Sequence, residues 1–179
     1  MGIQKIFDVE GHAHFTTINI YKRIPILQNS KFCDLIIENL EYYRKKFQYR
    51  LLGYVILPDH LHMIVIPNSR TKYSDIIRDF KKGVAFAVIK RLSNARNQNL
   101  LDKFSLNQVR RDGQRHSIWQ RKYFDFNIFS EKKFLEKLEY MHNNPVNLKL
   151  VENPGDWRYS SWRNYYLGDS SIISVDKLL

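Results

Sequence analysis

Four segments of the chain carry the apolar and aromatic patterns that are typical of β-strands. Residues 14–21 are rich in β-branched and aromatic side chains, and residues 119–128 alternate aromatic with polar ones, so each segment predicts a strand. Residues 49–57 and 60–67 are apolar runs on either side of Pro58-Asp59, a pair with turn chemistry. These two runs therefore predict a pair of strands joined by a tight turn.

Apolar residues recur at helical spacing in two further segments. Residues 31–47 predict a helix with Ser30 in a position to cap it, and residues 71–92 predict a second helix. The second helix leaves three basic residues for its solvent side: Arg78, Lys81 and Lys82. Residues 93–117 are polar and lack a clear period, so they predict a long loop or a partly ordered excursion over a nucleic-acid-binding face, and loops of that length are usually functional or mobile.

A third helix is predicted from about Glu131 to Asn144, with Ser130 as its N-cap and Pro145 ending it. Its expected apolar stripe consists of Phe134, Leu135, Leu138 and Met141. A second stripe, well away from the first, consists of Lys133, Lys137, Tyr140 and Asn144. A tyrosine on a basic stripe is not needed for packing. The alternative interpretation is an exposed tyrosine that lies along lysine stems.

The order of these elements predicts the fold class. Strand, helix, strand, strand, helix and strand, followed by a further helix, is the ferredoxin-like (RRM-like) βαββαβ arrangement of the α+β class. It implies one antiparallel sheet with two helices on one face, and an extra C-terminal helix. The chain has 179 residues without an internal repeat or a linker, so we expect one domain over residues 1–179. Many proteins share this fold, so the fold alone decides no function.

Charge points to an anionic partner. The formal net charge is +11, and residues 78–122 hold twelve Lys or Arg against three Asp. A solvated basic face would normally be interleaved with acids, so binding to a phosphate backbone explains this imbalance better. The residues expected to contact DNA, including two on the third helix, are Arg78, Lys81, Lys82, Arg110, Arg111, Arg115, Arg121, Lys122, Lys133 and Lys137.

Other features of the sequence indicate in which compartment of the cell the protein is expected. No apolar run approaches the ~18 residues of a membrane span, and the N-terminus lacks a signal-peptide pattern. The only cysteine, Cys33, cannot form an internal disulfide. We therefore expect a cytoplasmic protein with no membrane partner.

Two histidines open the strand after the Pro58-Asp59 turn. Side chains alternate across a strand, so His60 and His62 share one face of the sheet while Leu61, Met63 and Val65 share the other. Two imidazoles so placed can hold a divalent metal. The alternative is two hydrogen-bonded histidines near a strand end, because the spacing of two His is a weak signature. A second His-x-His pair, His12 and His14, follows a Gly-containing start and is expected at the surface rather than as a ligand.

The histidines and Tyr140 together satisfy a stricter chemical requirement. An enzyme can cut and rejoin a DNA strand without ATP when a tyrosine attacks a phosphate and keeps the bond energy as an ester. Tyrosine is a weak nucleophile at its ordinary pKa of ~10, so such a site needs a Lewis acid on the phosphate oxygens. Two His and one amide or carboxyl oxygen can hold Mg²⁺ or Mn²⁺. Asn144 lies one helical turn beyond Tyr140 and can supply that oxygen.

These motifs resemble a known family. Residues 57–62 (Leu-Pro-Asp-His-Leu-His) resemble the HUH motif of the single-tyrosine transposases. Residues 119–125, 138–146 and 156–161 are similar to motifs of the branch called REP-associated tyrosine transposases. The similarity covers nearly the whole chain. Two departures put the hairpin specificity in doubt: Phe126 and Phe129 replace the His and Arg of many members, and residues 93–117 are longer than usual.

The resemblance implies a function and a site. By it, His60, His62 and Asn144 are ligands of Mg²⁺ or Mn²⁺, and Tyr140 is the nucleophile that forms a 5′-phosphotyrosine. The implied substrate is single-stranded DNA next to a hairpin, and the implied protein is a monomer or a homodimer. Two alternatives remain open. One is a non-catalytic protein that binds single-stranded nucleic acid, with Tyr54 or Tyr123 stacking on bases. The other is a rolling-circle replication initiator or relaxase-type nickase.

Overall fold

The computed structural model describes residues 11–109 and 113–178. The described strands are β1 (Ala13–Asn19), β2 (Arg50–Leu57), β3 (His60–Ile66) and β4 (Phe124–Ile128). The α-helices are α1 (Ser30–Phe47), α2 (Tyr73–Asn94), α3 (Gln98–Lys103), α4 (Glu131–Asn147) and α5 (Trp162–Tyr166). Short 3₁₀ turns are η1 (Tyr21–Arg23), η2 (Ile26–Gln28) and η3 (Pro154–Asp156). The four strands form one antiparallel sheet in the order β2-β3-β1-β4, which confirms the predicted ferredoxin-like fold class.

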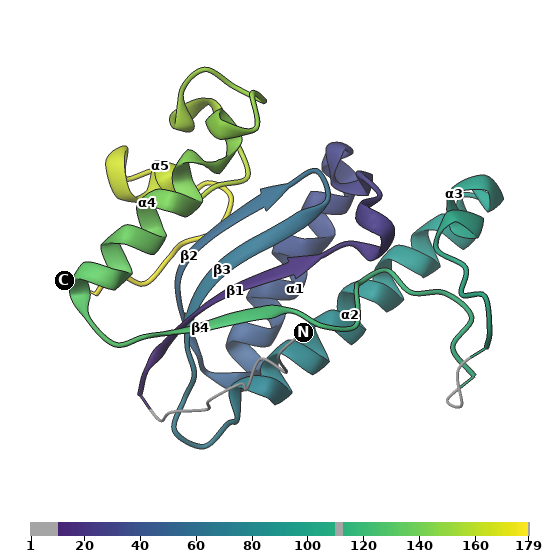
Figure 1. Ribbon diagram of the computed structural model, residues 1–179, viewed down its shortest axis with the longest axis horizontal. Coiled ribbons are helices and arrows are strands. Elements are labelled where there is room, and N and C mark those ends of the chain that lie inside the picture. Colours follow the sequence, from purple (N-terminus) through teal and green to yellow (C-terminus); the bar gives the residue numbers. More distant parts are fainter. Residues whose placement is uncertain (1–10, 110–112, 179) are drawn as a thin grey trace, which may run out of the picture.

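The two faces of the sheet are covered by different helices. On one face, Ile18, Ile56 and Met63 pack in one buried cluster with the apolar sides of α1 and α2. On the other face, Phe15 and Ile64 pack with α4. Figure 1 shows α1 and α2 behind the sheet and α4 in front of it. The extra helix therefore lies on the face that carries His60 and His62.

Side chains of α4 pack closely against the backbone of β2 at Gly53. A Cβ atom at Gly53 would lie 2.7 Å from the Met141 side chain and 3.0 Å from that of Leu138. A hydrogen-bonded chain adds to this contact, because Ser161 Oγ accepts from the Tyr54 N–H at 3.0 Å and lies 2.9 Å from His142 Nε2. A side chain at position 53 would have to displace the ends of the Met141 and Leu138 side chains, which pack α4 against the sheet.

Helix α4 differs from its prediction in two respects. Ser130 is its N-cap as expected, with Oγ accepting from the Lys133 N–H, but the helix continues through Pro145 to Asn147. Proline near a helix end removes one hydrogen bond, and here Pro145 is buried against the protein. Leu135 is 53% exposed and is not part of the packed stripe, whereas His142 is buried. The buried side of α4 is thus rotated relative to the expected stripe.

One other local prediction was wrong. The N-cap of α1 is Asn29 rather than Ser30, because the Asn29 side chain accepts from the Lys31 N–H at 3.0 Å. The stretch expected as a long loop or a partly ordered excursion contains α3 and a β-bridge between Ser105 and His116, so it is partly ordered. It also buries Phe104 in the core, which ties the segment down. In the part of the chain that the structure describes, no helix is long and apolar enough to cross a membrane.

Candidate catalytic and metal-binding site

An open cavity of about 660 Å³ lies on the α4 face of the sheet. Its lining residues come from β1, η1, β3, β4 and α4: Phe15, Thr17, Asn19, Arg23, His60, His62, Phe124, Lys137 and Tyr140. The cavity thus brings together four residues that the sequence singled out, which are separated by up to eighty positions along the chain: His60, His62, Lys137 and Tyr140.

The two histidines present one ring nitrogen each for a ligand. The centroids of their rings lie 4.8 Å apart, and the two rings are nearly perpendicular. His60 Nδ1–H donates to Asp59 Oδ1 at 2.6 Å, and His62 Nδ1 is 2.8 Å from Thr17 Oγ1. Such a partner on one nitrogen of an imidazole fixes the ring and leaves the other nitrogen for a metal. Within the described residues, the buried His62 Nε2 has no hydrogen-bond partner.

Burial keeps both imidazoles neutral. Burial, together with the positive charge that His60 would carry and that of Arg23, lowers the pKa of His62 to about 3. Burial also lowers the pKa of His60, although the carboxylate of Asp59 opposes that shift. Only a neutral imidazole has a free lone pair to give to a cation. Near pH 7 the pair therefore suits a divalent metal better than an anion.

Tyr140 stands over the histidines from α4. Its ring centroid is 5.8 Å from that of His62 and 6.0 Å from that of Phe15, and its side chain is 49% exposed. The ammonium of Lys137 lies 5.9 Å from the Tyr140 ring centroid. Tyr140 therefore borders the cavity and remains open to a substrate.

Asn144 is placed less directly. It is buried, its Nδ2 donates to Tyr140 O at 3.0 Å, and it is not among the residues that line the cavity. No three His, Cys, Asp or Glu side chains cluster as a metal site within residues 11–109 and 113–178. A metal on the two histidines would therefore complete its coordination with amide, water or substrate oxygens. The role of Asn144 stays a prediction.

The sequence did not single out several residues of the cavity. Thr17 and Asn19 face His62 and His60 across the pairing of β1 with β3, so a correct pairing of these strands would have found them. Asp59 was interpreted only as turn chemistry, although it contacts both His60 and Arg23. No pattern in the sequence distinguishes Arg23.

The second His-x-His pair is not at the surface as expected. His14 is fully buried, its Nδ1 lies 3.1 Å from Asp125 Oδ2, and its ring stacks on Tyr73 at 4.0 Å. The register of β1 and β4 points His14 toward α2, on the face opposite to His62. His14 is thus a buried residue of the α2 side whose Nδ1 is paired, although its Nε2, like that of His62, has no partner among the described residues. His12 is half-buried.

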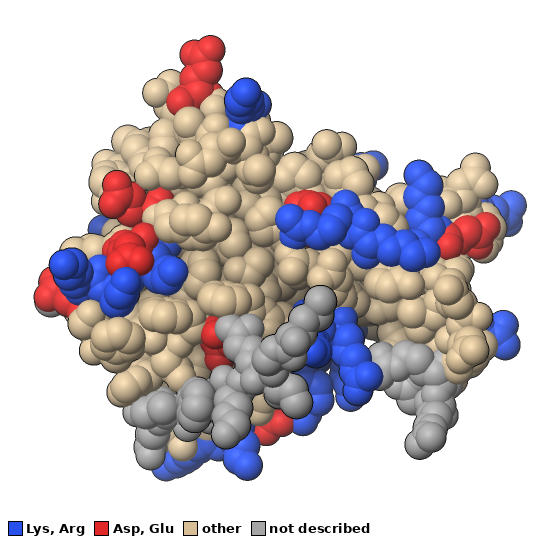
Figure 2. All heavy atoms as spheres, viewed as in Figure 1, with Lys and Arg blue, Asp and Glu red and all other residues tan. Residues whose placement is uncertain are grey.

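Part of the predicted basic set gathers in a second hollow, of about 440 Å³, between α2 and the segment that leads into β4. Arg78, Lys81, Lys82 and Arg121 line it beside Trp119 and Tyr123. Arg115 and Lys122 are exposed outside it, Lys133 pairs with Glu136 on α4, and Arg110 and Arg111 lie outside the described residues. Lys and Arg side chains are frequent on the right of Figure 2, whereas they mix with acidic ones over α4 on the left.

Lys81 differs from the solvated residue that the sequence predicted. Its ammonium donates to Gln120 O at 2.9 Å and to Arg121 O at 3.0 Å, and burial lowers the pKa of Lys81 to about 8. Arg78 is occupied as well, because it pairs with both Asp75 and Asp79. The chain between α2 and β4 folds back over Lys81, which periodicity within the helix does not reveal.

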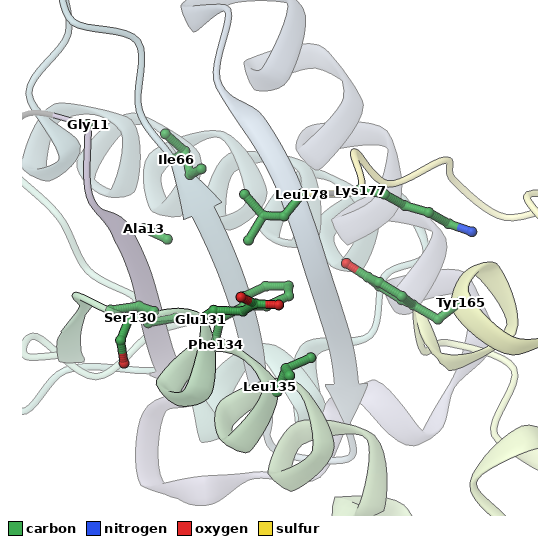
Figure 3. Close-up of a pocket in the computed structure, with 11 residues that line it drawn as sticks. Gly11, Ala13, Ile66, Ser130, Glu131, Phe134, Leu135, Tyr165, Lys177 and Leu178 are labelled. Atoms are coloured by element: carbon green, nitrogen blue, oxygen red, sulfur yellow. The ribbon is translucent and has the colours of Figure 1, made fainter.

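A third hollow, of about 450 Å³, lies between the first turn of α4, the sheet and the C-terminal segment (Figure 3). Apolar side chains such as Phe134, Ile66 and Leu178 dominate its lining. None of the residues predicted for catalysis, metal or DNA lines it. The chemistry-bearing groups are therefore concentrated in the first two hollows.

Comparison with known proteins agrees with this arrangement. The family model described as "Transposase IS200 like" matches residues 9–144, which include both histidines, Tyr140 and Asn144. A Haemophilus influenzae protein named "Putative REP-associated tyrosine transposase" is 26% identical over 157 residues, or 86% of this chain and 81% of that protein. An Escherichia coli REP-associated tyrosine transposase is 21% identical over 155 residues, or 86% and 78% of the two chains.

The fold also matches a solved structure. A REP-associated tyrosine transposase bound to a REP hairpin superimposes with a TM-score of 0.72 and 19% sequence identity. The match covers 100% of this chain and 94% of that one. At this identity the likeness shows the fold.

Proposed function

We propose that this chain, which belongs to the family of IS200-like transposases, cleaves and rejoins single-stranded DNA through a covalent bond to Tyr140. The observation that supports this most strongly is the cavity in which an exposed tyrosine stands beside two neutral histidines. Neither packing nor ordinary hydrogen bonding requires these three side chains to meet. The Tyr140 ring lies next to that of His62, whose Nε2 is orphaned, and this supports a phosphate held beside Tyr140 by a metal that the histidines would bind.

The chemistry follows from the residues. Tyr140 Oη attacks the phosphorus, the bond from phosphorus to the 3′ oxygen breaks, and the leaving strand ends in a 3′-hydroxyl. The phenolic proton passes to solvent, and the downstream strand stays on the protein as a 5′-phosphotyrosine. Attack of a 3′-hydroxyl on this ester reverses the step and rejoins a strand. His60 and His62, with Asn144 as a third candidate, would hold Mg²⁺ or Mn²⁺, which supplies Lewis-acid polarisation of the phosphate oxygens when bound.

The proposed substrate is single-stranded DNA next to a hairpin. The solved relative of the same fold is bound to a REP hairpin, and this chain carries an excess of basic residues beside β4. Tyr123 borders the basic hollow, while the next residue, Phe124, borders the catalytic cavity. A strand that crosses the edge of the sheet at β4 would therefore reach both. Aromatic rings at such a crossing can stack on bases.

A labelled-strand assay tests the proposal. Hairpin-bearing single strands with a 3′ or a 5′ label are incubated with the protein and Mn²⁺, and covalent adduct is separated under denaturing conditions. We expect adduct that carries the 3′ label and a free fragment that carries the 5′ label. Tyr140→Phe should abolish the adduct while binding survives, whereas Tyr166→Phe, at another exposed tyrosine, should not change it.

The same assay separates the alternatives. Adduct that persists in Tyr140→Phe would show that another group is the nucleophile. Binding to single strands with no adduct for any hairpin strand would favour the non-catalytic nucleic-acid-binding protein.

A further inference from the structure

Arg23 sits in an unusual backbone conformation directly after β1. Lys22 and Arg23 have φ angles of 54° and 56°, which lie in the left-handed region. For residues other than glycine this region costs roughly 1 kcal/mol or more each, and such strain is retained mainly at functional sites. Hydrogen bonds on either side hold the turn, from Ile20 N–H to Asp59 O at 2.8 Å and from Arg23 N–H to Ile20 O at 3.0 Å.

The strained turn directs Arg23 into the catalytic cavity. Its Nε donates to Asp59 Oδ2 at 2.8 Å, and its Nη1 donates to Asn19 Oδ1. The other carboxylate oxygen of Asp59 accepts from His60. A guanidinium has five N–H donors, so these two bonds leave others open, and the side chain is 49% exposed. Arg23 is thus fixed at its base and available at its tip, next to a histidine of the proposed metal site.

The charges around the cavity favour an anion at this point. Among the described residues that line it, Arg23 and Lys137 are cationic and none is a carboxylate. The Lys137 ammonium lies over the rings of Phe126 and Tyr140, at 5.0 and 5.9 Å from their centroids. Arg23 presents the planar donor fork that matches the oxygens of a phosphate.

We propose that Arg23 binds the phosphate that Tyr140 attacks and stabilises the negative charge that develops on it during transfer. The inference rests on the proposed function for the identity of that phosphate. Asp59 holds Arg23 and His60 through its two carboxylate oxygens, so the phosphate-binding and proposed metal-binding groups share one anchor.

A thermodynamic cycle tests the contact at the reacting phosphate. The cleaved position is mapped on a strand that the unmodified protein cuts, and that phosphate is replaced by a neutral methylphosphonate. Binding is then measured without divalent metal in the Tyr140→Phe background, where no cleavage occurs and no metal ion contacts the phosphate. We expect the replacement to weaken binding roughly 10- to 100-fold when Arg23 is present. With Arg23→Gln, which keeps hydrogen-bonding capacity and removes the charge, the replacement should have little effect.

A matched control excludes a purely structural role. Arg163 pairs with Asp169 at 2.8 Å and is 40% exposed, much like Arg23 with Asp59, but it does not line the cavity. Arg163→Gln should leave the methylphosphonate effect intact. Arg23→Lys should retain charge and binding while the rate of adduct formation falls, because the fork geometry is lost. If Arg23→Gln retains the full methylphosphonate effect, the proposal is wrong.

A second measurement does not depend on cleavage. Affinity for an oligothymidylate strand is measured against salt for the unmodified protein and for Arg23→Gln. Loss of one phosphate contact should make the negative slope of log K against log salt less steep by about 0.7. If the unmodified protein forms no adduct with any strand but the slope falls, the proposed function fails and the phosphate contact of Arg23 stands. An unchanged slope with normal adduct formation would contradict the role of Arg23 alone.

Discussion

The cavity on the α4 face and the hollow beside α2 both contain polar side chains. The two regions differ in whether groups of the chain itself bind these side chains. In the hollow, the Lys81 ammonium is bound by two backbone carbonyls, Arg78 by two carboxylates, and Trp119 Nε1 donates to Lys81 O. In the cavity, the buried His62 Nε2 has no partner among the described residues, and Tyr140 is exposed beside it.

A reactive site differs from a structural one in whether its polar atoms remain available to a ligand, rather than in the types of its residues. A buried polar atom without a partner costs about 1–3 kcal/mol, so a protein retains one mainly where a ligand satisfies it. The orphaned nitrogen supports the proposal that the cavity receives a ligand, whereas in the hollow the Lys81 ammonium is bound by carbonyls and the charge of Arg78 is offset by two carboxylates. Substitutions that each remove one polar group from the cavity or from the hollow test this difference.

Loss of a histidine in the cavity should have the largest effect. His62→Ala removes a proposed metal ligand, so we expect the rate of Mn²⁺-dependent adduct formation to fall on the order of 1,000-fold. His12→Ala, at the half-buried histidine of the other His-x-His pair, should cut normally. Adduct formation that survives in His62→Ala would show that the orphaned nitrogen has no catalytic purpose.

Loss of the carboxylate behind His60 should have a smaller effect. Asp59→Asn weakens the hold on His60 Nδ1–H, so the Mn²⁺ concentration needed for half-maximal adduct formation should rise roughly 10- to 100-fold. Asp79→Asn is the control, because Asp79 pairs with Arg78 and Lys46 on the other side of the molecule. An equal rise in both variants would indicate a general loss of stability instead.

Lys81 and Lys82 should separate into a structural and a DNA-contacting residue. Lys81→Ala leaves two backbone carbonyls without their donor, so the free energy of unfolding should fall by about 1–3 kcal/mol. Lys82→Ala should change it by no more than about 0.5 kcal/mol, because Lys82 is exposed. Only Lys82→Ala should make the negative slope of log K against log salt for single-strand binding less steep by about 0.7 without loss of stability. Equal melting temperatures for the two variants would contradict this division.

Lys81 should also make the stability of the protein depend on alkaline pH. The pKa of Lys81 is about 8 in the folded protein and 10.5 when unperturbed, so the unfolded chain binds more protons between these values. Lys81 should therefore make the free energy of unfolding rise with pH from about 8 to 10.5. Below that range the folded protein carries the full destabilisation from burying the charged ammonium. Lys81→Met should remove this contribution, as chemical denaturation at several pH values can measure. A variant with the same rise would assign it to another group.

Periodicity predicted those parts of the site that depend on one element alone. Alternation along β3 placed His60 and His62 on one face, and helical spacing placed Tyr140 away from the packed side of α4. The burial of His14 depends on the pairing of β1 with β4, which no local pattern encodes. Lys81 was misplaced because its partners, residues 120 and 121, lie some forty positions further along the chain.

The distinction between the two His-x-His pairs needed tertiary structure as well. His14 and His62 both lie in strands with the same alternation, but His14 faces α2 and its Nδ1 pairs with Asp125, whereas His62 faces the α4 side. Helix α4 continues past Pro145 because proline removes only one hydrogen bond there while the ring is buried. Such packing gains are set by the whole fold and cannot be derived from the helix sequence.

Anomalous diffraction from a crystal soaked in Mn²⁺ tests the central claim most directly, because it locates the metal without requiring a DNA sequence. We expect a peak between His60 Nε2 and His62 Nε2, below the ring of Tyr140, and the loss of that peak in His62→Ala. A peak at His12 and His14 with none at His60 and His62 would contradict it.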